Sequence, residues 1–170
     1  MIFLKPEQVI KEIPLKPDMV VAEFGCGSGG FVIPLAKRLE DGLVYAIDVQ
    51  EEPLNVLKSK SIAERLSNVK IVRADLENNS TLKENSTDLV IISNTLFQAE
   101  DRKAMIGEAG RVLKPKGILV VIDWEKGAPQ GPSEGISQDQ VKEISKERGF
   151  SFRENIEAGQ YHYGLIFEKQ

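Results

Sequence analysis

A glycine-rich segment, Gly25-Cys26-Gly27-Ser28-Gly29-Gly30, directly follows a short apolar run and precedes a helix-like segment. Glycine lets the backbone turn tightly and come close to a ligand. Between a strand and a helix, such a segment is a usual ligand-binding loop of an open α/β sheet. We therefore predict a ligand-binding loop here, and a tight turn without a ligand is the structural alternative.

The glycine spacing fits two patterns at once. Gly25, Gly27 and Gly30 match G-x-G-x-x-G, which is typical of dinucleotide binders, whereas Gly25, Gly27 and Gly29 match G-x-G-x-G. Asp48 closes the next apolar run, and a carboxylate at that place can accept hydrogen bonds from both hydroxyls of a ribose. Because NAD and other adenosine cofactors all carry that ribose, these residues predict an adenosine-containing ligand without choosing among them.

Five short apolar runs are spread evenly along the chain, at residues 20–24, 43–47, 69–73, 88–92 and 118–122. Such runs, rich in β-branched residues and without strict alternation, are typical of strands that are covered on both faces. Helix-like segments lie between or after them, at residues 31–40, 53–66, 101–113 and 137–148. We interpret the order as a strand–helix unit repeated five times, which predicts a parallel sheet with right-handed crossovers.

The segment 137–148 carries the clearest helix signals. Ser137 and Gln140 have the spacing of a capping box, and Gly149 is placed as a C-terminal cap. After it, residues 150–152 and 161–168 predict two strands around a turn. Near the start of the chain, residues 6–13 predict a short helix packed on the edge of the sheet.

Length and composition indicate one globular domain. The chain has 170 residues, 41% of them hydrophobic and 28% charged, and its net charge of −4 argues against a general polyanion binder. Its start lacks signal-peptide features, and no apolar run approaches the roughly 18 residues of a membrane helix. Its one cysteine forms neither a disulfide nor a zinc cluster. We expect a single cytoplasmic domain over residues 1–170, with a lead-in helix at 1–17, a Pro/Gly-rich loop at 125–135, no metal and no membrane contact.

Further polar residues flank the apolar runs. Glu23 lies two residues before the first glycine, Asp75 follows the third run, and Ser93 follows the fourth. With the segment 111–117, these residues resemble the class I S-adenosylmethionine-dependent methyltransferases, especially the small-molecule, ubiquinone-biosynthesis branch (methyltransferase type 11), over residues 18–124. The resemblance implies a Rossmann-like, doubly wound α/β fold, with a mostly parallel seven-stranded sheet, an antiparallel last strand and helices on both faces.

The resemblance also implies S-adenosyl-L-methionine as the cofactor and gives the matching residues roles in holding it. These are Glu23, Gly25, Cys26, Gly27 and Gly29 for the methionine part, Asp48 and Val49 for the ribose and adenine, Asp75 and Leu76 for the adenine, and Ser93 and Asn94 along the route to the sulfonium. The methyl donor carries its own leaving group, so placing the acceptor in line supplies much of the acceleration.

Two departures from the family pattern bear on the turn chemistry and on the acceptor. Lys116 stands where the family often has the first glycine of Lys-Pro-Gly-Gly, and we expect a type I turn there because that turn accepts lysine. After the fourth run, Ser93-Asn94-Thr95-Leu96 replaces the Asn/Asp-Pro-Pro-Tyr motif of amino-group methylases of adenine, cytosine or glutamine. That replacement argues against those substrates.

The acceptor side is marked by fewer residues. Trp124 follows the fifth run and is a candidate for stacking on the acceptor, while His162 and the neighbouring Tyr161 are candidates for the acceptor pocket. A general base is needed only if the acceptor arrives protonated, and we assign no catalytic residue. Core packing is the alternative role for Trp124, and a structural or exposed histidine is the alternative for His162. The loop at 125–135 is a candidate for a mobile flap.

We predict methyl transfer to a small-molecule acceptor by in-line displacement. One alternative keeps the cofactor and changes the acceptor to RNA or protein, since residues 27–30 are also similar to tRNA adenine methyltransferases, but no basic face supports a nucleic-acid partner. The others are an NAD-dependent oxidoreductase, for which the chain is short, and a cofactor-binding homologue without turnover. The sequence carries no indication of the oligomeric state.

Overall fold

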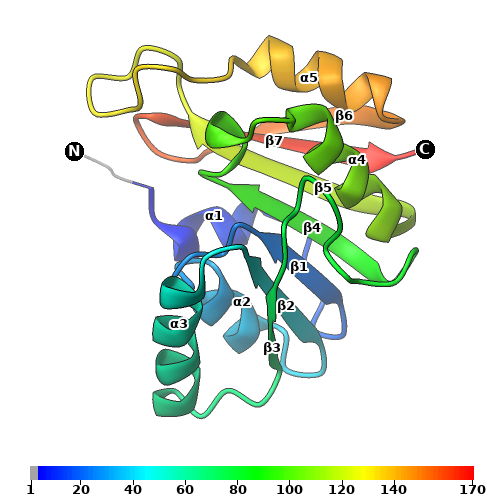
Figure 1. Ribbon diagram of the computed structural model, residues 1–170. Helices are drawn as coiled ribbons and strands as arrows, with labels where there is room; N and C mark the ends of the chain where they lie inside the picture. Colours follow the sequence, from blue (N-terminus) through cyan, green and yellow to red (C-terminus); the bar gives the residue numbers. More distant parts are fainter. Residues whose placement is uncertain (1–3) are drawn as a thin grey trace.

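In the computed structural model, residues 4–170 are described, and within them seven strands form one sheet in the order β3-β2-β1-β4-β5-β7-β6 (Figure 1). The neighbours among β1 to β5 run parallel, whereas β7 is antiparallel to both β5 and β6. The strands are β1 (Val20–Phe24), β2 (Leu43–Asp48), β3 (Val69–Arg73), β4 (Thr87–Ser93), β5 (Leu113–Trp124), β6 (Phe150–Ile156) and β7 (His162–Lys169). The predicted mostly parallel, seven-stranded sheet with an antiparallel last strand is confirmed.

Helices cover both faces of the sheet, as predicted. On one face, α1 (Pro6–Glu12), α2 (Val32–Arg38) and α3 (Glu51–Ala63) pack on a core layer that includes Val21 and Ile91. On the other face, η1 (Leu96–Gln98), α4 (Arg102–Val112) and α5 (Gln138–Glu147) pack on a layer that includes Phe24 and Ile92. Both layers are made of alternate residues of the same strands, which is why these strands are apolar throughout.

The position predicted for the first helix is wrong. Helix α1 contacts α2, and its buried Val9 and Ile10 belong to the core layer on that face, so α1 lies over the sheet instead of at its edge. Its sequence shows one buried stripe but not which neighbour covers that stripe. The predicted lead-in, residues 1–17, begins before the described part of the chain, since residues 1–3 lie outside it.

The capping signals of α5 are confirmed. The Ser137 hydroxyl accepts a hydrogen bond from the Gln140 backbone N–H at 3.3 Å, and the Gln140 side chain accepts one from the Ser137 N–H at 3.0 Å. Ile136 and Val141 flank this box and are both fully buried, which fixes the direction in which the chain enters the helix.

The connection from β3 to β4 departs from the predicted strand–helix repeat. Residues 74–86, all within the described part of the chain, contain turns and no helix. Asn78, Asn79 and Ser80 favour local side-chain hydrogen bonds over helix. The buried Glu108 of α4 holds this loop, because its Oε1 accepts hydrogen bonds from the Ser80 N–H at 2.8 Å and from the Ser80 hydroxyl at 2.6 Å.

Strand β5 begins five residues before the predicted apolar run, at Leu113, which pairs with Thr87 of β4. The turn within its first residues also differs from expectation. Lys116 has a φ of +65°, which excludes a type I turn and is the geometry that a type II turn requires at its third position. Lys116 therefore adopts a backbone conformation that favours glycine, and the lysine backbone is strained.

Replacing Lys116 with glycine is expected to stabilise the protein by about 0.5–1 kcal/mol, because relief of the left-handed strain exceeds the added freedom of the unfolded chain. Chemical denaturation checks this. Lys116→Ala is the control, since it also removes the exposed 3.5 Å ion pair with Glu168 but keeps the strain. Equal stability of the two variants would contradict strain as the cause.

Candidate functional site

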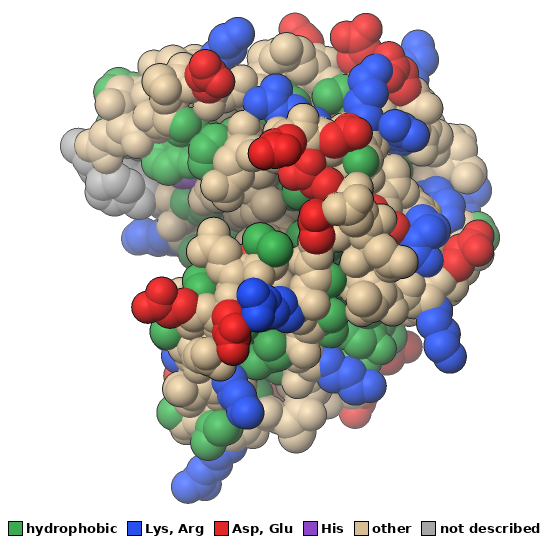
Figure 2. Space-filling view, in the orientation of Figure 1, with side chains coloured by type: hydrophobic (Ala, Val, Ile, Leu, Met, Phe, Trp, Pro, Cys, Tyr) green, Lys and Arg blue, Asp and Glu red, His purple; other side chains and the backbone are tan. Residues whose placement is uncertain are grey.

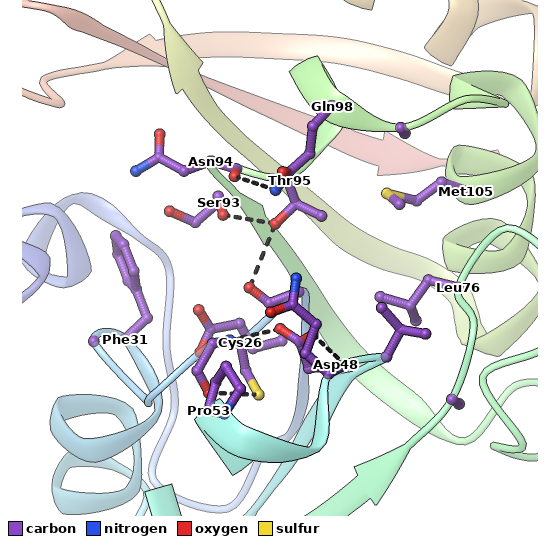
Figure 3. Close-up of a pocket in the computed structure, with 18 of the residues that line it drawn as sticks. Cys26, Phe31, Asp48, Pro53, Leu76, Ser93, Asn94, Thr95, Gln98 and Met105 are labelled. Atoms are coloured by element: carbon purple, nitrogen blue, oxygen red, sulfur yellow. Dashed lines mark hydrogen bonds between the residues drawn. The ribbon is translucent and has the colours of Figure 1, made fainter. Parts of the chain in front are cut away.

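A cavity of about 570 Å³ lies at the carboxyl ends of β1, β2 and β4 (Figure 3). In the space-filling view the surface is hollowed between the part that carries α3 and the part that carries α5 (Figure 2). Ten residues of the predicted cofactor site line it: Glu23, Gly25, Cys26, Gly27, Asp48, Val49, Asp75, Leu76, Ser93 and Asn94. Gly29 does not line the cavity, and a Cβ there would lie 2.4 Å from Leu57 of α3, so it allows the loop to pack on that helix.

The glycine loop and Asp48 fix one another. The backbone N–H groups of Gly25 and Cys26 donate to the Ile47 carbonyl, at 2.8 and 3.0 Å. The Asp48 carboxylate accepts from the Gly27 N–H at 2.9 Å and from the Gln50 N–H at 3.0 Å. Each carboxylate oxygen keeps a further lone-pair direction, so Asp48 can accept hydrogen bonds from a ligand without moving.

Glu23 is a buried carboxylate at the floor of the same cavity, with 2% of its surface exposed. Burial raises its pKa well above the usual range, and the charge of Asp48 raises it further. Among the described residues, no group hydrogen-bonds to its Oε2 atom. A cationic ligand group placed there would supply the missing partner and favour the ionised form.

Thr95 is a site residue that sequence reasoning missed. Its hydroxyl donates to the Ser93 carbonyl at 2.9 Å and lies 3.4 Å from the Gly25 carbonyl. A Cβ on Gly25, which has a φ of +75°, would lie 2.1 Å from this hydroxyl oxygen. Gly25 is therefore required both by its backbone conformation and by the close contact of the loop with the end of β4.

Replacing Gly25 with alanine is expected to destabilise the protein by about 2–4 kcal/mol, from backbone strain together with the clash against Thr95. Gly27→Ala is the matched control, because Gly27 also has a positive φ but has open space where a Cβ would lie. Thermal unfolding of both variants separates the two causes. If Gly27→Ala costs as much as Gly25→Ala, the contact with Thr95 has no effect of its own.

Other lining residues were also missed, and Figure 3 shows how they are placed. Ser93, Asn94 and Phe31 lie at one end, Leu76 and Met105 at the other, with Asp48 between the two ends. The missed lining residues include Phe31, Gln50, Pro53, Thr95, Gln98 and Met105. Gln50 directly follows Val49 and Thr95 directly follows Asn94, both predicted site residues, and this adjacency is the one signal that could have found them.

The predicted acceptor residues lie outside this cavity lining. Trp124 ends β5 and His162 begins β7, and the two are paired across these strands with ring centroids 4.1 Å apart. The backbone carbonyl of Tyr161 accepts a hydrogen bond from the Glu125 N–H at 2.8 Å. The loop at 125–135 joins β5 to α5 without helix or strand, and a Cβ on its Gly131 would lie 3.2 Å from the Trp124 ring.

The described part of the chain contains neither a metal-binding cluster nor a membrane-spanning helix. In the described residues, no three His, Cys, Asp or Glu side chains are grouped so that they could hold a metal ion. No helix within residues 4–170 is both long and apolar enough to cross a bilayer. Burial and the nearby Glu23 charge raise the pKa of the Cys26 thiol, so this cysteine stays protonated at neutral pH.

The arrangement fits one kind of ligand. It offers a cation the Glu23 carboxylate, whose Oε2 atom has no hydrogen-bond partner among residues 4–170. It also offers the fixed Asp48 carboxylate for vicinal hydroxyls, and the apolar side chains of Leu76 and Met105 for a flat base. Cofactors of open α/β sheets bind at this edge, where the strand order reverses between β1 and β4. A nucleoside that carries an ammonium group at its other end meets all three features.

Comparison with known proteins shows the family to which the chain belongs. Residues 22–121 match the family described as a methyltransferase domain. The chain belongs to this family and, with its sheet order, to the class I S-adenosylmethionine-dependent methyltransferases, which confirms the predicted cofactor. Membership also decides against the NAD-dependent oxidoreductase.

Three relatives show the branch. The chain is 32% identical over 118 residues to a demethylmenaquinone methyltransferase of Staphylococcus aureus, covering 69% of this chain and 48% of that protein. It is 28% identical over 159 residues to a ubiquinone/menaquinone biosynthesis C-methyltransferase of Campylobacter jejuni, covering 91% and 65%. A SAM-dependent methyltransferase structure from Aquifex aeolicus is 32% identical, covers 99% of this chain and 91% of that chain, and has a TM-score of 0.91. The chain thus spans between about half and two thirds of the curated relatives it matches.

Proposed function

We propose that this protein transfers the methyl group of S-adenosylmethionine to a small, planar, hydroxyl-bearing ring of the quinol type. The observation that carries the proposal is a cavity in which the buried Glu23 carboxylate, whose Oε2 atom has no hydrogen-bond partner among the described residues, and a fixed Asp48 carboxylate are combined with apolar walls. The names of the two quinone-pathway relatives support the acceptor class. The net charge of −4 also favours a small acceptor over a nucleic acid.

Each residue around the cavity has a role in this proposal. Glu23 binds the ammonium group of the methionine part, and the loop at residues 25–29 shapes the space around that part. Asp48 accepts hydrogen bonds from the ribose hydroxyls, and Val49 and Leu76 lie against the adenine, whose amino group is near Asp75. The bound cofactor supplies an activated methyl group on a sulfonium with its own leaving group.

The acceptor side of the proposal is the end of the cavity that contains Ser93 and Asn94. The side chains of Ser93 and Asn94 line the route to the methyl group. Trp124, Tyr161 and His162 lie farther along the same edge of the sheet, at the ends of β5 and β7. These residues hold the acceptor in line with the methyl group and keep water away, and that positioning accounts for most of the acceleration.

Methyl transfer to reduced 1,4-naphthoquinone, followed as a gain of one methyl mass in the product, tests the proposal. The expected result is cofactor-dependent methylation of the ring compound and none of bulk tRNA. Methylation of tRNA with a steep dependence on salt would identify a polymer acceptor instead. Tight cofactor binding with no transfer to the hydroquinone would contradict the proposed acceptor class.

A further inference from the structure

A row of side chains continues from the cofactor cavity along the carboxyl edge of the sheet. Ser93 of β4 pairs with Ile122 of β5, and Trp124 is two residues farther along β5, so all three side chains point to the same face. Trp124 pairs with His162 of β7, which puts the imidazole on that face as well. Ser93, Trp124 and His162 therefore form a row that starts in the cavity lining.

The row lies on the face that α1 and α2 cover. Ile122 belongs to the core layer beneath these helices, together with Phe31, which lies at the same end of the cavity as Ser93 in Figure 3. Ser93 is therefore the member of the row that lines the cavity, and Trp124 and His162 continue the row on the same face outside that lining. Gly131 of the Pro/Gly-rich loop lies against the Trp124 ring and limits the row on that side.

His162 is buried, with 8% of its surface exposed, and neither ring nitrogen has a hydrogen-bond partner among the described residues. Buried polar groups in native proteins almost always have partners, so such an imidazole calls for a ligand or water. Burial also lowers its pKa below the usual value, which keeps the ring neutral and able to accept a proton at neutral pH.

Three titratable groups that neighbour the Trp124–His162 pair along the chain, Asp123, Glu125 and Tyr163, have hydrogen-bond partners elsewhere. Asp123 and Tyr163 flank the Trp124–His162 pair along their strands but point to the opposite face. There, the Asp123 carboxylate accepts from the Phe97 and Trp124 N–H groups, at 3.0 and 2.8 Å. The Tyr163 hydroxyl donates to the Ile136 carbonyl at 3.0 Å, and Glu125, next to Trp124, accepts from the Gln138 side chain at 2.8 Å.

We propose that His162 is the general base of the reaction and that Trp124 is the surface on which the hydroxyl-bearing ring of the acceptor is held. The inference rests on the proposed function and names the residue that removes the acceptor proton. It assigns a role to a buried imidazole that has no hydrogen-bond partner within residues 4–170.

One ring nitrogen of His162 takes the proton of the acceptor hydroxyl, and the electron pair that is freed makes the adjacent ring carbon nucleophilic. That carbon forms a bond to the methyl carbon while the methyl–sulfur bond breaks, and the bonding pair stays on sulfur, which gives neutral S-adenosylhomocysteine. The ring carbon then loses its own hydrogen as a proton to water, and His162 releases the first proton to solvent.

The placement of His162 can be tested first on the unmodified protein. Trp124 is the single tryptophan of the chain, and a protonated imidazole 4.1 Å from it quenches indole fluorescence. We expect the emission to fall as the pH is lowered through a midpoint below 6.5. Burial raises the pKa of Asp123 to about 6, so its titration must be separated from that of His162. His162→Gln makes this separation, because it removes the imidazole and leaves Asp123 in place.

The role as base is tested by the rate of methyl transfer to reduced 1,4-naphthoquinone as a function of pH. We expect His162→Gln to lower the maximal rate by roughly a hundredfold and to abolish the loss of rate at acid pH, with the cofactor dissociation constant unchanged. His162→Phe, which keeps the ring on Trp124, should lose the same rate but still bind the hydroquinone, as measured by Trp124 quenching.

The outcomes separate the inference from the proposed function. If the wild-type protein methylates the hydroquinone and His162→Gln keeps its rate and pH profile, His162 is not the base, and the proposed function stands. If the wild-type protein does not methylate the hydroquinone, the proposed function and this inference are both overturned. A fluorescence titration that His162→Gln leaves unchanged would overturn the placement of the imidazole, whether or not the variant is active.

Discussion

Replacing Asp48 with alanine is expected to weaken S-adenosylmethionine binding by at least roughly a hundredfold, which corresponds to about 2.7 kcal/mol. The carboxylate is proposed to accept two hydrogen bonds from the ribose, and hydrogen bonds to a charged group contribute about 1.5–3 kcal/mol each. The same side chain also holds the Gly27 and Gln50 N–H groups, so its removal loosens the loop that shapes the site. Calorimetric titration of the cofactor measures the change.

Two controls separate the causes of that loss. Asp48→Asn keeps an oxygen that can accept from the Gly27 N–H but removes the charge, and it should fall between the wild type and Asp48→Ala. Glu51→Ala removes an exposed carboxylate three residues away that pairs with Arg73 at 2.7 Å, and it should leave the cofactor affinity unchanged. An unchanged dissociation constant in Asp48→Ala would overturn the assignment of the whole cavity.

Replacing Glu23 with glutamine is expected to have two opposite effects. Without the cofactor, the variant should be more stable than the wild type at neutral pH by about 1–3 kcal/mol, because folding of the wild type must either take up a proton at the buried Glu23 or bury its charge, and glutamine requires neither. With the cofactor, the variant should lose roughly a hundredfold in affinity, because the ammonium group loses its charged partner.

The pH dependence of this stability difference has a definite sign. The folded-state pKa of Glu23 is raised, so the folded protein holds its proton to higher pH than the unfolded chain does. The Glu23 contribution to stability therefore falls as the pH rises from about 4.5, the unfolded value, toward the raised folded value. The difference in unfolding midpoint between Glu23→Gln and the wild type should be absent below that range and largest above it.

Cofactor binding should also release a proton from Glu23 in the wild type and none from Glu23→Gln. Titrations in buffers of different ionisation enthalpy count that proton. Glu12→Gln is a suitable control, since Glu12 is an exposed carboxylate of α1 outside the cavity lining. Equal proton release from the wild type and Glu23→Gln would show that the ammonium group is bound elsewhere.

The parts of the fold that were predicted from sequence are those whose residues carry a local signal. All of the parallel strands except the edge strand β3 are largely buried on both faces and appear as apolar runs, and the capping box at Ser137 and Gln140 marks the start of α5. The extension of β6 to Ile156 was missed because most of that edge strand is exposed and shows no apolar pattern. The early start of β5 was missed because the Lys114-Pro115-Lys116 turn conceals the pairing of Leu113 with Thr87.

The part of the site that lies at the carboxyl edge of the parallel strands could be predicted from the sequence. Residues that directly follow the parallel strands, such as Asp48 and Ser93, must gather at one edge of the sheet, so a sequence motif suffices to place them together. Met105 and Gln98 reach the cavity only through the packing of α4 and η1, which no local pattern specifies. The pairing of Trp124 with His162 depends on the register between β5 and β7, and the sequence does not encode that register on its own.

The helix-free connection from β3 to β4 has a consequence for local opening of the protein. Strand β3 is at the edge of the sheet, and each of its residues is at least partly exposed, whereas β4 at the centre is almost fully buried. Backbone amides of β3 should therefore exchange with deuterium through a smaller fluctuation than those of β4. Asp75 and Leu76, which are proposed to contact the adenine, follow β3. Binding of the cofactor should therefore slow exchange most in this edge strand, far from the methyl group itself.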